Sequence, residues 1–142
     1  MAQTTPSAAK DIGRLSNRLR RRLDALSSRK EFSGSQGRTL HFLLAQTRDV
    51  FQKDVEEEFG IRPPTASELL KQMERNGLIL RQPADHDNRL KKIVLTEKAL
   101  QFREQVMEDL AGLEQTLTAG VSRKDLATFF KVMDTMMENM SE

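Results

Sequence analysis

The chain has 142 residues, of which 37% are hydrophobic and 31% charged, and this length fits one compact domain with an appended helical region. It has no cysteine and only two histidines, which excludes disulfides, thiolate metal sites and cysteine nucleophiles, so that no metal site is expected. The apolar runs are only a few residues long and the first residues form no hydrophobic signal region; we therefore exclude a membrane protein and expect a cytoplasmic one.

The net charge of +2 is unevenly distributed along the chain. Residues 1–30 carry eight Lys or Arg and two acids, residues 31–96 carry ten of each, and residues 97–142 carry five and nine. The basic charge is therefore concentrated toward the front of the chain.

After a flexible tail over residues 1–7, an amphipathic helix is predicted from Ala8 to about Lys30. Its apolar residues recur every three or four positions: Ile12, Leu15, Leu19, Leu23 and Leu26. Its opposite face is strongly basic. The arginines within residues 18–22 form either a solvated face or, if DNA lies nearby, a set of phosphate contacts, and the sequence leaves both open.

Two shorter helices are predicted next. Ser35 is the expected N-cap of the first of them, which carries leucines within residues 40–44. After a polar link, the second is predicted to end at Gly60, from the spacing of its apolar residues: Phe51, Val55 and Phe59.

A fourth helix is predicted to begin at Pro63-Pro64 after a turn of a few residues, because first-turn N–H groups have no partner within a helix. Asn76-Gly77 supplies its C-terminal stop. Its apolar face consists of Ala66, Leu69, Leu70 and Met73. Its polar face consists of Thr65, Ser67, Glu68, Lys71, Gln72 and Arg75.

The period of the pattern then changes. Residues 78–82 and 90–95 are short runs of branched apolar residues, separated by a turn-rich segment over residues 83–89, and they predict two antiparallel strands. Thr96 is expected to open a long helix that ends at Gly120. Ser122, with Asp125 three residues on, predicts a capping box for a last helix rich in methionine.

Three helices followed by a hairpin make a winged helix-turn-helix, so the predicted fold is mainly α with a small β-hairpin wing. In this arrangement the second helix of the turn lies in the DNA major groove and the hairpin reaches the backbone or the minor groove. The predicted DNA-binding residues are Pro63, Pro64, Thr65, Ser67, Glu68, Lys71, Arg75, Arg89 and Lys91. A polar face on a helix alone would also be explained by exposure to solvent. The presence of the turn and the hairpin beside it favours DNA binding instead.

Arg89 is placed where a guanidinium could enter a narrow minor groove. Asp87 would oppose phosphate there unless it pairs with a cation. We therefore predict that Asp87 pairs with Arg81 on the neighbouring strand and that the two stabilise the wing. His41 is expected to be structural or pocket-lining, and His86 a turn residue.

Four segments in order carry a resemblance to a known family: Pro64-Thr65-Ala66-Ser67, Gly77-Leu78-Ile79-Leu80-Arg81, Asp87-Asn88-Arg89 and Ile93-Val94-Leu95-Thr96-Glu97-Lys98-Ala99. The sequence resembles the MarR (multiple antibiotic resistance regulator) family of bacterial transcription factors over nearly its whole length. The resemblance implies a dimeric repressor or activator that binds a pseudo-palindromic operator and releases it when a small, commonly aromatic ligand binds between the two regions. It also implies that Arg89 enters the minor groove.

Two positions depart from the family pattern. Asn88 stands where many members have a second arginine, and Glu68 adds a negative charge to the predicted DNA-binding face. Without cysteine, the chain cannot be one of the family's thiol-oxidation sensors.

A dimer is also indicated by the residues themselves, because the terminal helices carry apolar stripes that a small domain has little means to bury. We predict a dimerisation region over residues 8–34 and 97–142 and a DNA-binding domain over residues 35–96. The expected interface residues are Ile12, Leu15, Leu19, Leu110, Leu113, Leu117, Phe129, Met133 and Met137. The alternative is an intramolecular bundle.

The leading hypothesis is therefore a sequence-specific DNA-binding regulator, a repressor acting as a homodimer, with no cofactor and with a small aromatic effector that the sequence does not identify. A winged helix that binds protein remains the alternative, because of Glu68 and the acidic residues 56–58. An enzyme is not expected, since no catalytic arrangement of Ser, His and Asp and no Gly-rich phosphate loop is present.

Overall fold

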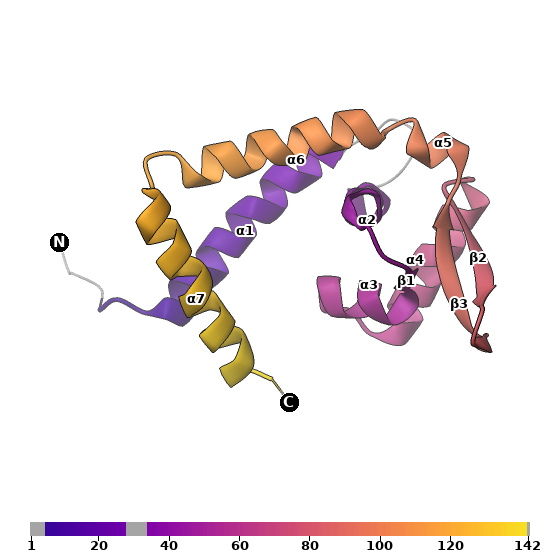
Figure 1. The fold of residues 1–142 in the computed structure, drawn as a ribbon, viewed down its shortest axis with the longest axis horizontal. Coiled ribbons are helices and arrows are strands. Elements are labelled where there is room, and N and C mark those ends of the chain that lie inside the picture. The colour runs from indigo at the N-terminus through magenta and orange to yellow at the C-terminus, as the bar shows by residue number, and fades with distance from the viewer. Residues whose placement is uncertain (1–4, 28–33, 142) are drawn as a thin grey trace. The chain divides into compact units, whose positions relative to one another are not determined.

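The computed structural model describes residues 5–27 and 34–141, and the chain divides into two compact units, Met1–Asp109 and Leu110–Glu142. Helices predominate, and the described residues include one small antiparallel sheet of three strands (Figure 1). The predicted fold class, mainly α with a small β wing, is confirmed. The predicted domains, a dimerisation region over residues 8–34 and 97–142 and a DNA-binding domain over residues 35–96, are defined by function. The division into two compact units does not test them, so they stay a prediction.

The chain begins with two helices, α1 (Ala8–Ser27) and α2 (Gly34–Ala45). The predicted end of the first helix near Lys30 lies outside the described residues. An ion pair joins the two helices, with 2.9 Å between Arg38 Nε and Asp24 Oδ1. Ser35 lies inside α2, where its carbonyl accepts a hydrogen bond from the Thr39 hydroxyl. The prediction that Ser35 is an N-cap is therefore wrong, because its own backbone is helical.

A strand that the sequence did not predict, β1 (Val50–Phe51), precedes α3 (Gln52–Phe59). Val50 pairs with Ile93 and Phe51 with Lys92, so that the strand order is β1-β3-β2. The prediction placed Phe51 in the helix, because Phe51 continues the four-residue spacing of Val55 and Phe59. Phe51 is instead the N-cap of α3, and its N–H donates to Asp54 Oδ2 at 2.9 Å.

Helix α4 (Pro63–Arg75) leads into the hairpin of β2 (Ile79–Ala84) and β3 (Asp87–Leu95). The hairpin, called the wing below, was predicted correctly, but Asp85 and His86 alone separate its strands, a shorter connection than the predicted 83–89. Pro83 is accommodated because β2 is an edge strand, where a residue without an N–H is tolerated.

The core of the first unit lies among α2, α3, α4 and the base of the wing. Its fully buried side chains come from all of these elements and include Leu40, Leu44, Val55, Leu70, Met73, Leu78 and Ile79. Burial of this many apolar side chains, each worth about 1.5–3 kcal/mol, fixes α4 and the wing to one common base.

The long helix predicted after the wing is divided in two, α5 (Glu97–Leu100) and α6 (Arg103–Thr118). Thr96 caps α5 as predicted, since its hydroxyl accepts from the Ala99 N–H. The Phe102 N–H then bonds the Ala99 carbonyl three residues back, which tightens the turn and ends α5. No Gly or Pro stands at this break, and the spacing of apolar residues continues across it. The break therefore could not be predicted from the sequence.

The last helix, α7 (Arg123–Asn139), begins as predicted at Ser122, whose hydroxyl accepts from the Asp125 N–H at 3.0 Å. None of its residues is buried within the chain. Among the described helices, none is both long and apolar enough to cross a membrane.

Candidate nucleic-acid interface

A tight turn sets the start of α4 against the end of α3. Gly60 adopts a left-handed backbone (φ 60°), and the Ile61 N–H donates back to the Glu56 carbonyl at 3.1 Å. Arg62 is the N-cap of α4, and the helix begins at Pro63 as the sequence predicted. The helix-turn-helix is therefore formed by α3, three connecting residues and α4.

Helix α4 presents opposite faces to the core and to solvent. Ala66, Leu70 and Met73 are fully buried. The exposed polar residues of α4, called the recognition face below, are Thr65, Glu68, Lys71 and Arg75. Pro63 and Pro64 are also exposed, and Ser67 is half-buried. The structure thus places the predicted DNA-binding residues of this helix toward solvent, apart from Ser67.

Two side chains of the recognition face pair with each other. Glu68 Oε1 lies 3.2 Å from Arg75 Nη2, two helical turns away, and both side chains remain more than half exposed. Lys71 lies between them along the helix, and no ion pair to it is found among the described residues. On the recognition face, Arg75 is therefore paired with an acid, whereas Lys71 has no paired acid among the described residues.

The end of α4, the Asn76–Gly77 junction, is closed by a Schellman motif. Gly77 has φ 73°, a left-handed conformation that favours glycine. Its N–H donates to the Glu74 carbonyl, and the Leu78 N–H donates to the Met73 carbonyl, each at 3.0 Å. The chain is thereby turned from the helix directly into the first strand of the wing.

Side chains from α2, from α5 and from the N-cap residue of α5 anchor this junction. The Asn76 amide donates to Gln36 Oε1 of α2 at 2.7 Å, and Lys98 Nζ of α5 donates to the Asn76 carbonyl at 2.9 Å. The Thr96 hydroxyl donates to the Gly77 carbonyl. Asn76-Gly77 was predicted to be a helix stop, but its partners Gln36 and Lys98 were not predicted, since no local signal connects residues so far apart in the chain.

A second link joins α4 to the wing, with 2.6 Å between Arg81 Nε and Glu74 Oε1. The predicted pairing of Arg81 with Asp87 is therefore not formed. The strand register explains the difference, because Arg81 lies opposite Ile93 while Asp87 lies opposite Ala84 at the tip. Glu74 was assigned no role from the sequence, although it projects from the last turn of α4 toward the base of the wing.

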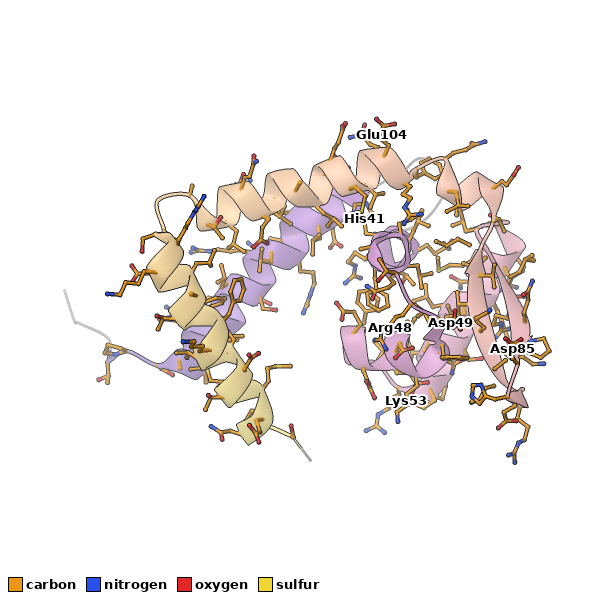
Figure 2. The ribbon with its side chains drawn as sticks, viewed as in Figure 1. His41, Arg48, Asp49, Lys53, Asp85 and Glu104 are labelled. Carbon is orange, nitrogen blue, oxygen red and sulfur yellow. The ribbon has the colours of Figure 1, made fainter. Side chains whose placement is uncertain are left out.

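Asp87 pairs instead with Arg89 on its own strand. The Arg89 backbone N–H donates to Asp87 Oδ1 at 2.9 Å, and its guanidinium Nε lies 3.2 Å from the same oxygen. The Arg89 side chain is nonetheless 91% exposed. Asp85 lies toward the same end of the hairpin (Figure 2), and Lys91 is exposed on β3. The tip therefore presents an exposed guanidinium whose backbone is held by Asp87.

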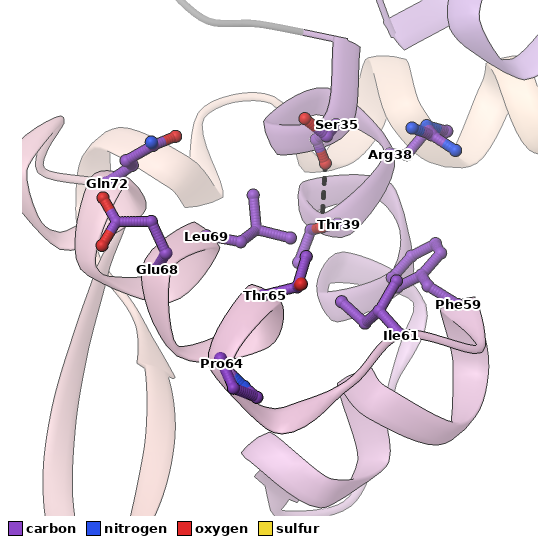
Figure 3. Close-up of a pocket in the computed structure, with 10 residues that line it drawn as sticks. All are labelled: Ser35, Arg38, Thr39, Phe59, Ile61, Pro64, Thr65, Glu68, Leu69 and Gln72. Atoms are coloured by element: carbon purple, nitrogen blue, oxygen red, sulfur yellow. Dashed lines mark hydrogen bonds between the residues drawn. The ribbon is translucent and has the colours of Figure 1, made fainter.

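An open groove of about 580 Å³ runs beside the recognition face. Its walls come from α2, the last residue of α3 with the turn that follows it, and α4 (Figure 3). Phe59, Ile61 and Leu69 supply apolar surface, while Thr65 and Glu68 belong to both the groove and the recognition face. His41 is buried on α2 (Figure 2) and does not line this groove. Among the described residues, no cluster of acids and histidines could hold a metal ion.

The predicted interface residues are at least partly exposed in the single chain. Ile12 and Leu15 of α1 are 43% and 44% exposed, and Phe129 and Met137 of α7 are 46% and 68% exposed. Leu117 is exposed, and the remaining members are half-buried: Leu19, Leu110, Leu113 and Met133. Helices α1, α6 and α7 thus each have exposed apolar side chains that a partner could cover.

The hydrogen bonds from Arg89 give a prediction about pH. The backbone N–H and then the guanidinium of Arg89 stabilise the Asp87 carboxylate and hold its pKa below the ordinary value of 3.8. Because this pKa is lower in the folded chain, the contribution to stability is present above the unfolded pKa and is lost as pH falls through the folded pKa. We expect an NMR titration of the Asp87 carboxyl carbon to show this low midpoint.

Arg89→Ala removes the guanidinium and keeps the backbone N–H, so the Asp87 midpoint should rise but stay below the ordinary value. Arg14→Ala, which removes an exposed arginine of α1, should leave it unchanged. An ordinary pKa that does not respond to Arg89→Ala would contradict this geometry at the wing tip.

Comparison with known proteins identifies the family. Residues 31–90 match the MarR family model. The MarR transcription regulator of Oenococcus oeni PSU-1 is 26% identical over 93% of this chain and 99% of that chain, with a TM-score of 0.76. S. aureus MepR in its DNA-binding conformation is 25% identical over 96% and 100%, with a TM-score of 0.83. The heme sensor PefR of Streptococcus agalactiae is 31% identical over 94% and 90%, with a TM-score of 0.52.

These relatives match more than nine-tenths of the chain, and the family and fold are those of transcription regulators. The expectation drawn from the four sequence segments is therefore confirmed: this chain belongs to the MarR family and has its winged helix fold.

Proposed function

We propose that this chain is a sequence-specific DNA-binding transcriptional repressor that acts as a homodimer on a pseudo-palindromic operator. Helix α4 enters the major groove and the wing lies on the minor groove. The observation that carries the proposal is an exposed polar face on α4 joined directly to a wing with an exposed arginine near its tip. The similar fold of MepR in a DNA-binding conformation supports it.

The recognition face supplies groups suited to DNA. Thr65 can donate to phosphate or to a base edge, and Lys71 carries a positive charge that no described acid compensates. An apolar face would be expected instead if α4 docked against another protein. The face therefore favours DNA over the protein-binding alternative.

The wing supplies a second contact. Because Asp87 fixes the backbone at Arg89 but leaves 91% of its side chain exposed, the guanidinium is free to exchange its carboxylate partner for the negative potential of a narrow minor groove. Lys91, exposed two residues further on, can contact the backbone.

Fluorescence anisotropy tests DNA binding directly. The probe is a duplex from immediately upstream of the chain's own gene, compared with a scrambled duplex over a series of salt concentrations. We expect tighter binding to the upstream duplex, weakened about tenfold by Lys71→Gln or Arg89→Ala, each variant lowering the salt slope by about 1.

Lys124→Gln is the matched control, because it removes an exposed lysine from α7, outside the winged helix. It should leave both affinity and salt slope unchanged. If the wild type binds both duplexes weakly and equally, and selection from random duplexes also enriches no sequence, DNA recognition is refuted and a protein partner becomes the better account.

The homodimer is proposed because apolar side chains are exposed on the terminal helices. Helix α7 buries no residue within the chain, yet Phe129, Phe130 and Met137 are all about half exposed or more. Covering such side chains contributes about 25 cal/mol per Å² of apolar area removed from water. A second copy also supplies the two-fold symmetry that a palindromic operator requires.

Analytical ultracentrifugation tests the dimer. We expect the wild type to sediment with twice the chain mass of 16.2 kDa, and Phe129→Glu to shift it toward the monomer because a carboxylate would be buried in the interface. Leu90→Glu is the matched control, since Leu90 of the wing is 44% exposed against 46% for Phe129 and lies outside the predicted interface. A wild-type monomer at micromolar concentration, or equal effects of the two variants, would argue against this interface.

Relief of DNA binding by a small aromatic effector remains part of the proposal. The groove beside α4 lies within the predicted DNA-binding domain and not between the two regions, and a ligand there would alter the recognition face because Thr65 and Glu68 line it. A ligand can shift the DNA equilibrium only by its differential affinity for the free and bound states. Titration of salicylate into the operator complex supplies the assay, with a fall in anisotropy as the supporting result and an unchanged signal as the opposing one for that ligand.

A further inference from the structure

An acidic side chain, Glu68, occupies the middle of the recognition face. It is 58% exposed, and no other acid belongs to that face. A carboxylate carried into the major groove approaches the phosphates, and this repulsion weakens binding to every sequence alike. Only a base that donates a hydrogen bond to the carboxylate can offset the repulsion.

The base edges differ in what they offer a carboxylate. Guanine presents the acceptors N7 and O6, thymine the acceptor O4 and a methyl group, and adenine the N6 donor beside the N7 acceptor. Cytosine presents its N4 donor with no acceptor of its own beside it. A carboxylate therefore matches cytosine best, while an amide, which both donates and accepts, matches adenine.

The pairing of Glu68 with Arg75 extends this match to a whole base pair. Cytosine N4 and guanine O6 are hydrogen-bonded to each other within the pair, so they lie about 2.7–3.2 Å apart on the major-groove edge. In the free chain the Glu68 acceptor and the Arg75 donor lie side by side at 3.2 Å. The ion pair thus presents an acceptor and a donor at the spacing at which a C·G pair presents a donor and an acceptor.

We propose that Glu68 is a specificity-determining residue that selects cytosine at one position of each operator half-site, with Arg75 as the positioning residue that holds its carboxylate and donates to the paired guanine. This inference rests on the proposed function, since it requires that α4 enter the major groove. Glu68 gives selectivity at the expense of general affinity, because any base without a suitable donor leaves the carboxylate unpaired in the groove.

Selection from a random-sequence duplex library tests the proposal. The purified full chain is used as wild type, as Glu68→Gln and as Lys71→Ala, and the enriched duplexes are sequenced. We expect the wild type to favour cytosine at one position of each half-site by at least about fivefold over the other bases. Glu68→Gln should shift that position toward adenine and leave the others unchanged.

Lys71→Ala is the control, because Lys71 lies on the same face and carries charge without a paired acid among the described residues, and alanine adds no amide that could read adenine. It should weaken binding to all duplexes and keep every base preference. Identical thermal unfolding curves for the three proteins would show that the exposed substitutions leave the fold intact.

The proposal is overturned if Glu68→Gln retains the wild-type preference at every position, or if it tightens binding to all sequences equally. Either result leaves the proposed function standing, because the wild type still selects a sequence. A wild type that enriches no sequence overturns both the base assignment and the proposed function.

Discussion

The position of the wing relative to α4 depends on the hydrogen bonds at the Asn76–Gly77 junction. Gly77 takes a left-handed backbone that lets the Leu78 N–H return to the Met73 carbonyl, so the chain leaves the helix and enters β2 without an intervening loop. Gln36 and Thr96 then tie the junction to α2 and to the end of β3. A helix and a hairpin that are adjacent in sequence are thereby held as one body, as the proposed contact with two grooves of a duplex requires.

Three ion pairs lie within α4, within the wing, or between the two. Arg81 pairs with Glu74, Arg75 with Glu68 and Arg89 with Asp87, and in each pair the acid precedes the cation by two or seven positions. Exposed pairs such as Arg75–Glu68 add little to stability, about 0–1 kcal/mol each. The Glu68–Arg75 and Asp87–Arg89 pairs instead orient a carboxylate and a guanidinium where the proposed function has them meet DNA.

Much of the architecture could be predicted from local signals. The prolines at 63 and 64, the Asn76-Gly77 stop and the cap at Thr96 all act within a few residues, so the start and end of α4 and the start of α5 were predicted at the right places. The elements that were missed depend on distant partners. The two-residue strand β1 exists because β3 offers it a hydrogen-bonding edge, and no period can be detected in so short a segment.

The candidate site divides in the same way. That most of the polar residues of α4 face solvent followed from helical periodicity, but the partners of Arg81 and Asp87 did not, because they depend on strand register and on the approach of α4 to the wing. Charge complementarity in the sequence favoured the pair Arg81–Asp87, and the register placed those residues too far apart along the hairpin. The links from Gln36 and Lys98 to Asn76 join residues 40 and 22 positions apart.

Native-state hydrogen exchange tests most directly whether α4 and the wing form one body. We expect the amides of Met73, Leu78 and Ile93 to exchange with the same free energy of opening, and Gly77→Ala to lower all three by about 1–2 kcal/mol, the cost of a left-handed backbone at a residue with a Cβ. Such a Cβ would meet Lys98 Cδ at an ordinary distance of 3.8 Å, so backbone strain accounts for the change. Wing amides that exchange at a lower free energy than those of α4, or a Gly77→Ala effect confined to the wing, would contradict the account.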